Sequence, residues 1–312
     1  VLMQEVQDTL WNSLGQMLIA DLLRSGKTAS WTDYKKSQAD NLLLMKTRID
    51  GIENAEDKRL LMGDDLENAS DIYYGNNTLT VEGCEHGTFV AGVVGGNGGN
   101  DKRYAGVADG VAKLMILRAA PEGDEYDKDV ATAIRYAVDN GAKVINISLG
   151  KYQSPTPQMV SDAIAYAAKH DVFVVHAAGN NGLCIDTIAY YPTGRNANGK
   201  AYPNYLRVGA SGMDGRCCKF SNYGSENVDI LAPGEAIASA FPNDNYGTSQ
   251  GTSVAAPVVS GIVALIRSYF PKMKAADIKS LLMRTVRKND QEDKSLSGGC
   301  IDMLNAVKEI IK

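Results

Sequence analysis

A serine at the start of an apolar helix is the first residue of this chain whose position suits chemistry. Ser253 lies in the segment 246–266, YGTSQGTSVAAPVVSGIVALI, where the apolar run after Ser253 predicts a buried helix. Gly251 and Thr252 are interpreted as a flexible lead-in, and Pro257 is expected near the first turn, where a missing N–H costs little. The first N–H groups of a helix have no helical partner. They could therefore stabilise the oxyanion that forms when a nucleophilic hydroxyl there attacks a carbonyl group. The alternative is a buried, N-capped helix without chemistry.

A histidine occupies a similar place in the segment 85–95, EHGTFVAGVVG. The dipole at a helix N-terminus disfavours a protonated imidazole, which would keep His86 neutral and ready to act as a base. A single histidine in such a place can equally be structural. The glycines of 92–99 resemble a dinucleotide loop only superficially, because they follow a helix and no helix opens after them.

An asparagine ends a strand-like run at 172–180, VFVVHAAGN. Sites in α/β sheets lie at the carboxyl ends of the strands, which is where Asn180 is expected. Its side-chain amide could donate a hydrogen bond to the oxygen that becomes negative in acyl transfer. His176, on the same run, is interpreted as a core or pocket-wall residue rather than a second base.

The elements that must position these residues alternate between strand and helix patterns. Such alternation predicts a parallel sheet with helices on both faces. Strands are expected at 113–117, 143–147, 172–176, 206–209 and 228–231, and helices at 128–140, 158–170, 253–269 and 275–287. The apolar spacing in residues 1–62 predicts helices instead, and a polar loop follows them. We therefore expect two domains, a helical extension or insertion with its loop at 1–80 and a catalytic core at 81–312.

The serine, histidine and asparagine segments, in their order along the chain, resemble the boxes of the subtilisin-like serine proteases (subtilases). Two further segments are similar to that family, NISLG at 146–150 and DILAPG at 229–234. The resemblance extends from about Cys84 to Leu304 and implies a three-layer α/β/α fold with a mostly parallel central sheet. It also implies hydrolysis of polypeptides through an acyl-enzyme, without a redox or nucleotide cofactor.

The same resemblance implies a role for each matching residue. Ser253 would be the nucleophile, His86 the general base and then acid, and Asn180 part of the oxyanion hole together with the Ser253 N–H. Three residues would pair through their main chain with an extended substrate. These substrate-binding residues are Ser148, Leu149 and Gly150. Gly179 would help to line the pocket for the side chain before the scissile bond.

The catalytic aspartate that the resemblance implies is missing from its expected place. Subtilases carry it on an early strand, upstream of the histidine box, in a pattern of two apolar residues, Asp, Ser or Thr, and Gly. The acids Asp50, Asp64, Asp65 and Asp71 lack such a strand and are interpreted as loop acids, and Asp109 comes too late in the chain. The sheet is therefore expected to lack its first core strand or strands. We expect the acid upstream of Val1 or on a separate, associated fragment.

Composition and charge narrow the possible classes of protein and of binding partner. With 312 residues, 44% of them hydrophobic, and a net charge of −5, the chain predicts a globular protein that does not bind nucleic acid. No apolar run reaches the roughly 20 residues of a membrane span, and no signal peptide is visible, although the resemblance implies export. The five cysteines match no zinc pattern and leave the redox compartment open; they are Cys84, Cys184, Cys217, Cys218 and Cys300.

Structural calcium is an expectation from the resemblance alone, with oxygen ligands offered by 97–101 and 186–198. The acidic run 122–129 predicts either acids that complement a helix dipole or a negative rim beside the substrate. The function predicted is that of a serine endopeptidase. The alternative is a catalytically impaired binding or scaffolding protein of the same fold, whereas an esterase lacks its Gly-x-Ser-x-Gly motif around Ser253.

Overall fold

The computed structural model describes part of the chain. The described residues are 39, 42, 43, 46, 63–81, 83–99, 101–120 and 125–312. The chain divides into two compact units, residues 1–58 and 59–312. Residues 39, 42, 43 and 46 of the first unit are helical, as predicted, and the rest of the predicted helical stretch 1–62, with Asp50, lies outside the described residues. The loop 63–81 belongs to the second unit, and the domain boundary at 80/81 stays a prediction.

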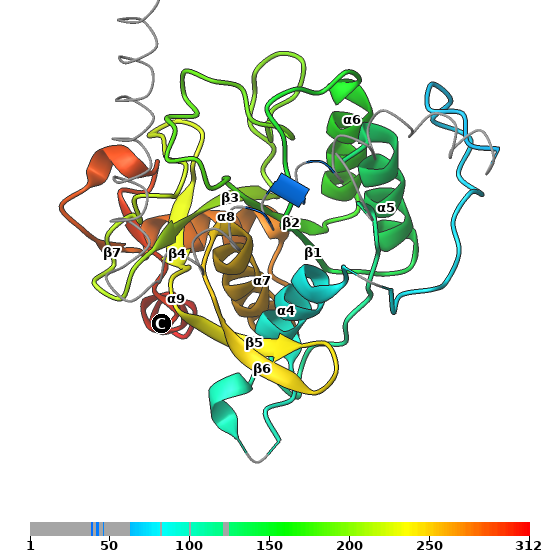
Figure 1. Ribbon diagram of the computed structural model, residues 1–312. Coiled ribbons are helices and arrows are strands. Elements are labelled where there is room, and N and C mark those ends of the chain that lie inside the picture. The colour runs from blue at the N-terminus through cyan, green and yellow to red at the C-terminus, as the bar shows by residue number, and fades with distance from the viewer. Residues whose placement is uncertain are drawn as a thin grey trace, which may run out of the picture. The chain divides into compact units, whose positions relative to one another are not determined.

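A six-stranded sheet forms the centre of the second unit (Figure 1). Its strands lie in the order β1-β2-β3-β4-β8-β7, and neighbours are parallel from β1 to β8 while β7 is antiparallel to β8. The strands are β1 (Val144–Ile147), β2 (Phe173–Ala177), β3 (Tyr205–Ser211), β4 (Ile230–Pro233), β7 (Arg287–Lys288) and β8 (Gly299–Cys300). The mostly parallel sheet that the alternating pattern predicted is therefore confirmed.

Helices cover both faces of this sheet. The side chains of β2 alternate between two cores, because successive residues of a strand point to opposite faces. Phe173 and Val175 join one core with α7, α8 and α9, and Val174 joins the other with α5 and α6. The helices are α5 (Asp127–Asp139), α6 (Pro157–Lys169), α7 (Thr252–Tyr269), α8 (Ala275–Arg284) and α9 (Met303–Ile310). The predicted three-layer α/β/α fold is confirmed, although α8 ends at Arg284 and Arg287 lies in β7.

Helix α7 runs through the first of these cores. It is long and apolar enough to cross a membrane by length and composition, but 61% of its apolar window is buried inside the protein. Among the described residues it is the one helix that meets those two conditions. Its apolar length is therefore accounted for by packing against the sheet.

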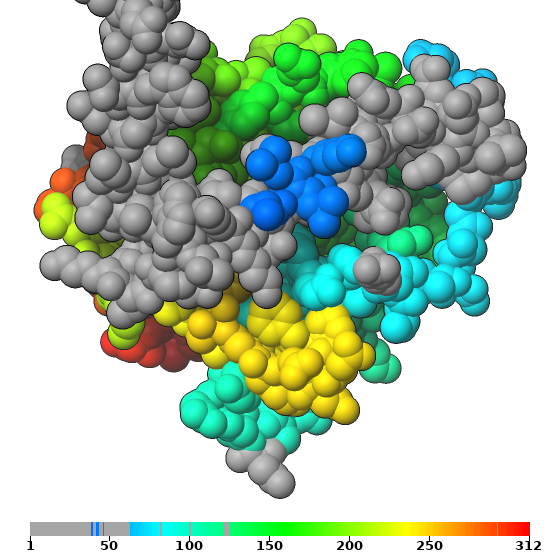
Figure 2. All heavy atoms as spheres, in the orientation of Figure 1, coloured from blue at the N-terminus to red at the C-terminus, as the bar shows by residue number. Residues whose placement is uncertain are grey.

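Helix α4 (Glu85–Gly95) packs against α7 and against a separate two-stranded hairpin. The hairpin consists of β5 (Ile237–Phe241) and β6 (Asn245–Ser249), which are antiparallel. Figure 2 shows this hairpin at the surface, beside the short 3-10 helix η1 (Lys102–Tyr104). Phe89 and Val93 of α4 form a buried cluster with Val254 of α7, which fixes α4 against the beginning of α7.

The predicted strand at 113–117 is not formed. Residues 112–120 belong to no helix or strand, and their main chain from 113 on makes no backbone hydrogen bond within the described part of the chain. Leu114, Met115 and Ile116 are 41–45% exposed although they form an apolar run. At the edge of the sheet, β1 likewise pairs with β2 alone among the described strands. The described residues thus supply no strand partner for this apolar segment or for that edge of the sheet.

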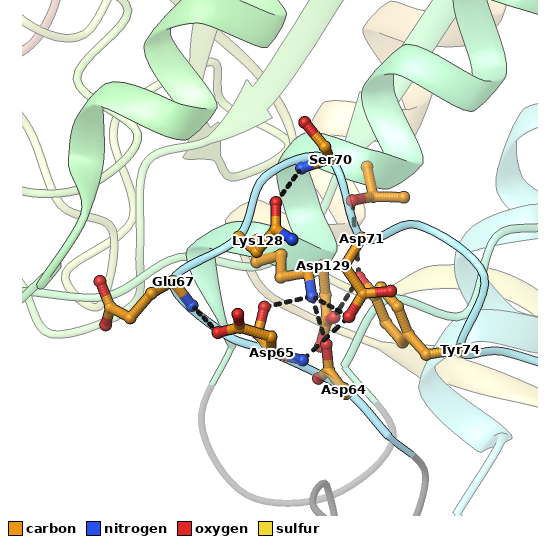
Figure 3. Close-up of polar contacts among 10 residues, drawn as sticks. Asp64, Asp65, Glu67, Ser70, Asp71, Tyr74, Lys128 and Asp129 are labelled. Atoms are coloured by element: carbon orange, nitrogen blue, oxygen red, sulfur yellow. Dashed lines mark hydrogen bonds and ion pairs between the residues drawn. The ribbon is translucent and has the colours of Figure 1, made fainter.

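The polar loop 63–81 is attached to the N-terminus of α5 by a buried ion-pair cluster (Figure 3). The ammonium group of Lys128 donates to Asp64, to the carbonyl of Asp65 at 2.5 Å and to Asp71 at 3.1 Å. The side chains of Lys128 and Asp64 are 2% and 0% exposed. Desolvation lowers the pKa of Lys128, but the two carboxylates outweigh it and the net shift is upward. The loop is therefore held by a fully desolvated charge rather than lying free in solvent.

Candidate active site

The hydroxyl of Ser253 and the amide of Asn180 lie next to the same glycine. Gly251 has a φ of 145°, and a Cβ there would lie 3.2 Å from Ser253 Oγ, 3.3 Å from Asn180 Nδ2 and 3.5 Å from Asn180 Oδ1. A side chain at this position would therefore collide with both groups and would be strained by its backbone. The structure brings the predicted nucleophile and the predicted oxyanion donor together, at the N-terminus of α7 and the carboxyl end of β2.

Thr252 joins these two segments, which is a role that the sequence did not predict. Its buried hydroxyl accepts a hydrogen bond from the Gly179 N–H at 2.9 Å and donates one to Asn180 Oδ1 at 3.0 Å. Asn180 Oδ1 also accepts the Thr252 N–H at 2.8 Å. The amide oxygen is thus held on the protein side, and the Nδ2 group is left to donate outward. The interpretation of Gly251 and Thr252 as a flexible lead-in is wrong, because Thr252 is fully buried and bonded.

The carbonyl of Ser253 receives a side-chain hydrogen bond in place of a helical one. Pro257 lies inside α7, four residues after Ser253, and has no N–H to donate to that carbonyl. The Ser148 hydroxyl donates to it instead, at 2.7 Å. Ser148 Oγ in turn accepts from Asn146 Nδ2 at 2.9 Å, and Asn146 Oδ1 accepts from Ser260 at 2.9 Å. A chain of hydrogen bonds therefore ties the nucleophile's main chain to the end of β1.

His86 is the second residue of α4, the helix that packs through Phe89 and Val93 against Val254, the residue after Ser253. The residue is exposed on one side, and desolvation by the surrounding protein lowers the pKa of His86 below its ordinary value of 6.5. A lowered pKa keeps the imidazole neutral near pH 7, as a general base requires. Within the described residues, His86 forms no ion pair with a carboxylate.

The candidate acids of the described region are engaged elsewhere. Asp64 and Asp71 bind Lys128, as described above, and a hydrogen bond from the Asp65 N–H lowers the pKa of Asp71. Asp65 accepts from the Glu67 N–H, and Asp109 pairs with Lys102 at 3.2 Å. Their interpretation as acids outside the triad agrees with these contacts, and none of them orients His86.

Leu149, one of the predicted substrate-binding residues, contacts His176, the buried histidine of β2. The Leu149 carbonyl accepts a hydrogen bond from His176 Nε2 at 2.8 Å, so that nitrogen carries the proton. Burial lowers the pKa of His176 well below 6.5, and the residue has no solvent exposure. It is a buried core residue, which is one of the two roles predicted for it. The Gly150 main chain makes no hydrogen bond to another described residue, whereas the next residue, Lys151, bonds with Tyr191.

A cavity of about 190 Å³ adjoins this segment on the side of α5 and α6. Leu149, Gly150 and Lys151 line it, together with the loop 191–197. Neither Gly179 nor Asn180 lines it. The lining of the cavity therefore includes Gly150 but not the Gly179 side of the predicted substrate-binding segments.

The acidic run and the expected calcium segments mostly carry structural contacts. In the described residues 125–129, Asp127 pairs with Lys151 at 3.3 Å and accepts from the Thr156 N–H at 2.9 Å. Asp186 accepts the N–H groups of Glu226 and Asn227, so its oxygens face donors rather than an open cation site. The described residues hold no group of three or more His, Cys, Asp or Glu suited to a metal, and structural calcium stays a prediction. All five cysteines are free thiols.

Comparisons with known proteins agree with this geometry. The profile of the subtilase family matches residues 47–299. The thermophilic serine proteinase of Bacillus sp. (strain AK1) is 32% identical over 288 residues, which is 90% of this chain and 66% of that protein. The major intracellular serine protease of Bacillus subtilis (strain 168) is 37% identical over 187 residues, 59% of this chain and 55% of that protein.

Solved structures give the same fold. The epidermin leader peptide processing serine protease from Staphylococcus aureus is 25% identical, with a TM-score of 0.63 over 73% of this chain and 64% of that one. The prenylagaramide maturation protease PagA is 28% identical, with a TM-score of 0.58 over 72% of this chain and 82% of that one. The chain spans 66% and 55% of the length of the two curated relatives described above. With its family profile, its sheet and its serine, histidine and asparagine segments in agreement, the chain belongs to the subtilase family.

Proposed function

We propose that this chain is the larger part of a serine endopeptidase that hydrolyses polypeptides. The observation that carries the proposal is the placement of Ser253 Oγ and the Asn180 amide against Gly251, at the N-terminus of α7. Ser253 attacks the peptide carbonyl and passes its proton to His86. The resulting oxyanion accepts hydrogen bonds from Asn180 Nδ2 and from the Ser253 N–H, which has no acceptor within the helix. His86 then protonates the leaving amine, and water releases the acyl group by the reverse steps.

The substrate main chain would lie along residues 148–150. The unpaired main chain of Gly150 supports this assignment, because an extended peptide could add to it as a further strand. Gly179 would line the space for the side chain before the scissile bond. No cofactor enters these steps.

The triad acid would come from a strand that this sequence does not contain. Among the described residues, one edge of β1 and the exposed segment 113–117 have no strand partner, which supports this proposal because a parallel strand next to them could satisfy both. Its aspartate would fix the imidazole tautomer of His86 and stabilise the imidazolium. In serine proteases the loss of that acid lowers the rate by on the order of 10⁴.

The test combines labelling of Ser253 by a fluorophosphonate probe with intact-mass measurement of the native protein under denaturing conditions. We expect labelling that is lost in Ser253→Ala, and a further segment, upstream or on a co-purifying fragment, that carries an apolar-apolar-Asp-Ser/Thr-Gly strand. A native protein that consists of a single 33.4 kDa species and never labels would mean that this chain alone is not a competent enzyme. The alternative, a catalytically impaired binding or scaffolding protein, would then be preferred. Export stays a prediction, because one relative is named as intracellular and another as cell wall-associated.

A further inference from the structure

The ring of Tyr190 lies between the two segments assigned to the substrate. A Cβ built on Gly150 would lie 2.7 Å from the Tyr190 hydroxyl and 2.8 Å from its Cε1 and Cζ. A Cβ built on Gly179 would lie 2.9 Å from Cζ and 3.1 Å from Cε2. One edge of the ring therefore faces Gly150 and the other faces Gly179. Both contacts are so close that only glycine leaves room for the ring.

Neighbouring rings hold Tyr190 in this position. Its ring stacks on that of His176 with centroids 5.7 Å apart and an interplanar angle of 17°, and meets Tyr152 edge-on at 5.1 Å. His176 is itself fixed by the Leu149 carbonyl. The Tyr190 carbonyl accepts a hydrogen bond from the buried Arg207 at 3.0 Å, and Tyr190 is 7% exposed. A substrate side chain could displace this ring only by breaking several of these contacts.

The end of the ring that points between the glycines is polar. The Tyr190 hydroxyl makes no hydrogen bond to any described residue, although the ring around it is buried. Desolvation raises the pKa of Tyr190, so the hydroxyl stays protonated and can donate. A small substrate side chain would meet a hydroxyl donor there, whereas a large apolar one would overlap the ring.

The geometry points to Tyr190 as the residue that determines specificity at this site: it fills the pocket for the side chain before the scissile bond and restricts that side chain to glycine, alanine or serine. This inference rests on the proposed function, since it assigns the substrate class of the same site.

The experiment compares two peptides that differ only before the scissile bond, where one has alanine and the other phenylalanine. The wild-type protein, with its acid strand present, is expected to favour the alanine peptide in kcat/KM by at least about tenfold. Tyr190→Gly opens the pocket and is expected to reverse this preference. Tyr190→Phe keeps the ring and serves as the matched control, with the wild-type order of preference.

Fluorophosphonate labelling of Ser253 and a thermal melt accompany every variant. If the wild-type protein labels but cleaves the phenylalanine peptide as fast as the alanine peptide, the inference is overturned while the proposed function stands. That comparison uses the wild type alone, so it holds even if Tyr190→Gly does not fold. A Tyr190→Gly protein that folds, labels and keeps the wild-type preference also overturns it. A wild type that neither labels nor cleaves rejects the proposed function itself.

Discussion

Removing the hydroxyl of Thr252 tests how the oxyanion donor is held. Thr252→Val has nearly the same shape, but it leaves the buried Gly179 N–H without its 2.9 Å acceptor and removes one of the two donors to Asn180 Oδ1. A buried group left unpaired costs about 1–3 kcal/mol. In a domain of this size we expect the melting temperature to fall by about 2–4 °C for each kcal/mol.

The same change should slow catalysis through Asn180. Loss of an oxyanion donor costs on the order of 10²–10³ in kcat, and a loosened donor should cost less, about tenfold, with KM little changed. Thr252→Ser keeps both hydrogen bonds and is the matched control. The assay is peptide hydrolysis with active sites counted by fluorophosphonate titration.

A double-mutant cycle then separates positioning from a general structural effect. In an Asn180→Ala background, Thr252→Val has no amide to misplace, so we expect its effect on kcat to disappear. If Thr252→Val lowers kcat equally in both backgrounds, Thr252 does not act through Asn180, and the reasoning is refuted.

Three further predictions follow from other contacts. Lys128→Met removes the buried ammonium group that pairs with the Asp64 carboxylate. This change should lower the free energy of unfolding by about 3–5 kcal/mol in a denaturant titration, and an unchanged midpoint would contradict the buried ion pair. Desolvation disfavours the imidazolium of His86, so its NMR titration in this chain alone should have a midpoint below pH 6.5. Addition of the acid strand should raise that midpoint. A midpoint above 6.5 without the strand would be inconsistent with the desolvated environment of His86. Ser148→Ala removes the hydroxyl that donates to the Ser253 carbonyl, which should lower the free energy of unfolding by about 1–3 kcal/mol. Thermal unfolding measures this change, and an unchanged melting temperature would mean that water replaces the hydroxyl.

Local pattern in the sequence was sufficient to predict most of the sheet, while the roles of the candidate site residues stay predictions. The apolar runs that became β1 and β2 and the helix after Ser253 lie within one or two residues of their expected bounds. These elements are predictable because each carries its own periodicity and its own end signals. The run 113–117 has a similar apolar pattern, but strand formation also needs a hydrogen-bonding partner, which local sequence does not reveal.

The contacts that hold the site together have no local signal. Thr252 bonds to residues more than 70 positions earlier in the chain, and Lys128 to acids about 60 positions earlier. Tyr190 stands in an irregular loop-rich stretch, where neither helical nor strand periodicity indicates which way a ring points. Such long-range pairings are fixed only when the sheet brings the segments together.

The unpaired edge of β1 also affects how the chain behaves in concentrated solution. In the described part of the chain, one edge of β1 has no strand partner, and Leu114, Met115 and Ile116 are exposed in a segment that has none either, so a strand of a neighbouring molecule could add there. Self-association of this chain should therefore increase with its concentration and decrease when a peptide occupies the edge. Light scattering of the purified chain would measure this self-association. The edge that the proposed acid strand would cover therefore also decides how readily the chain aggregates.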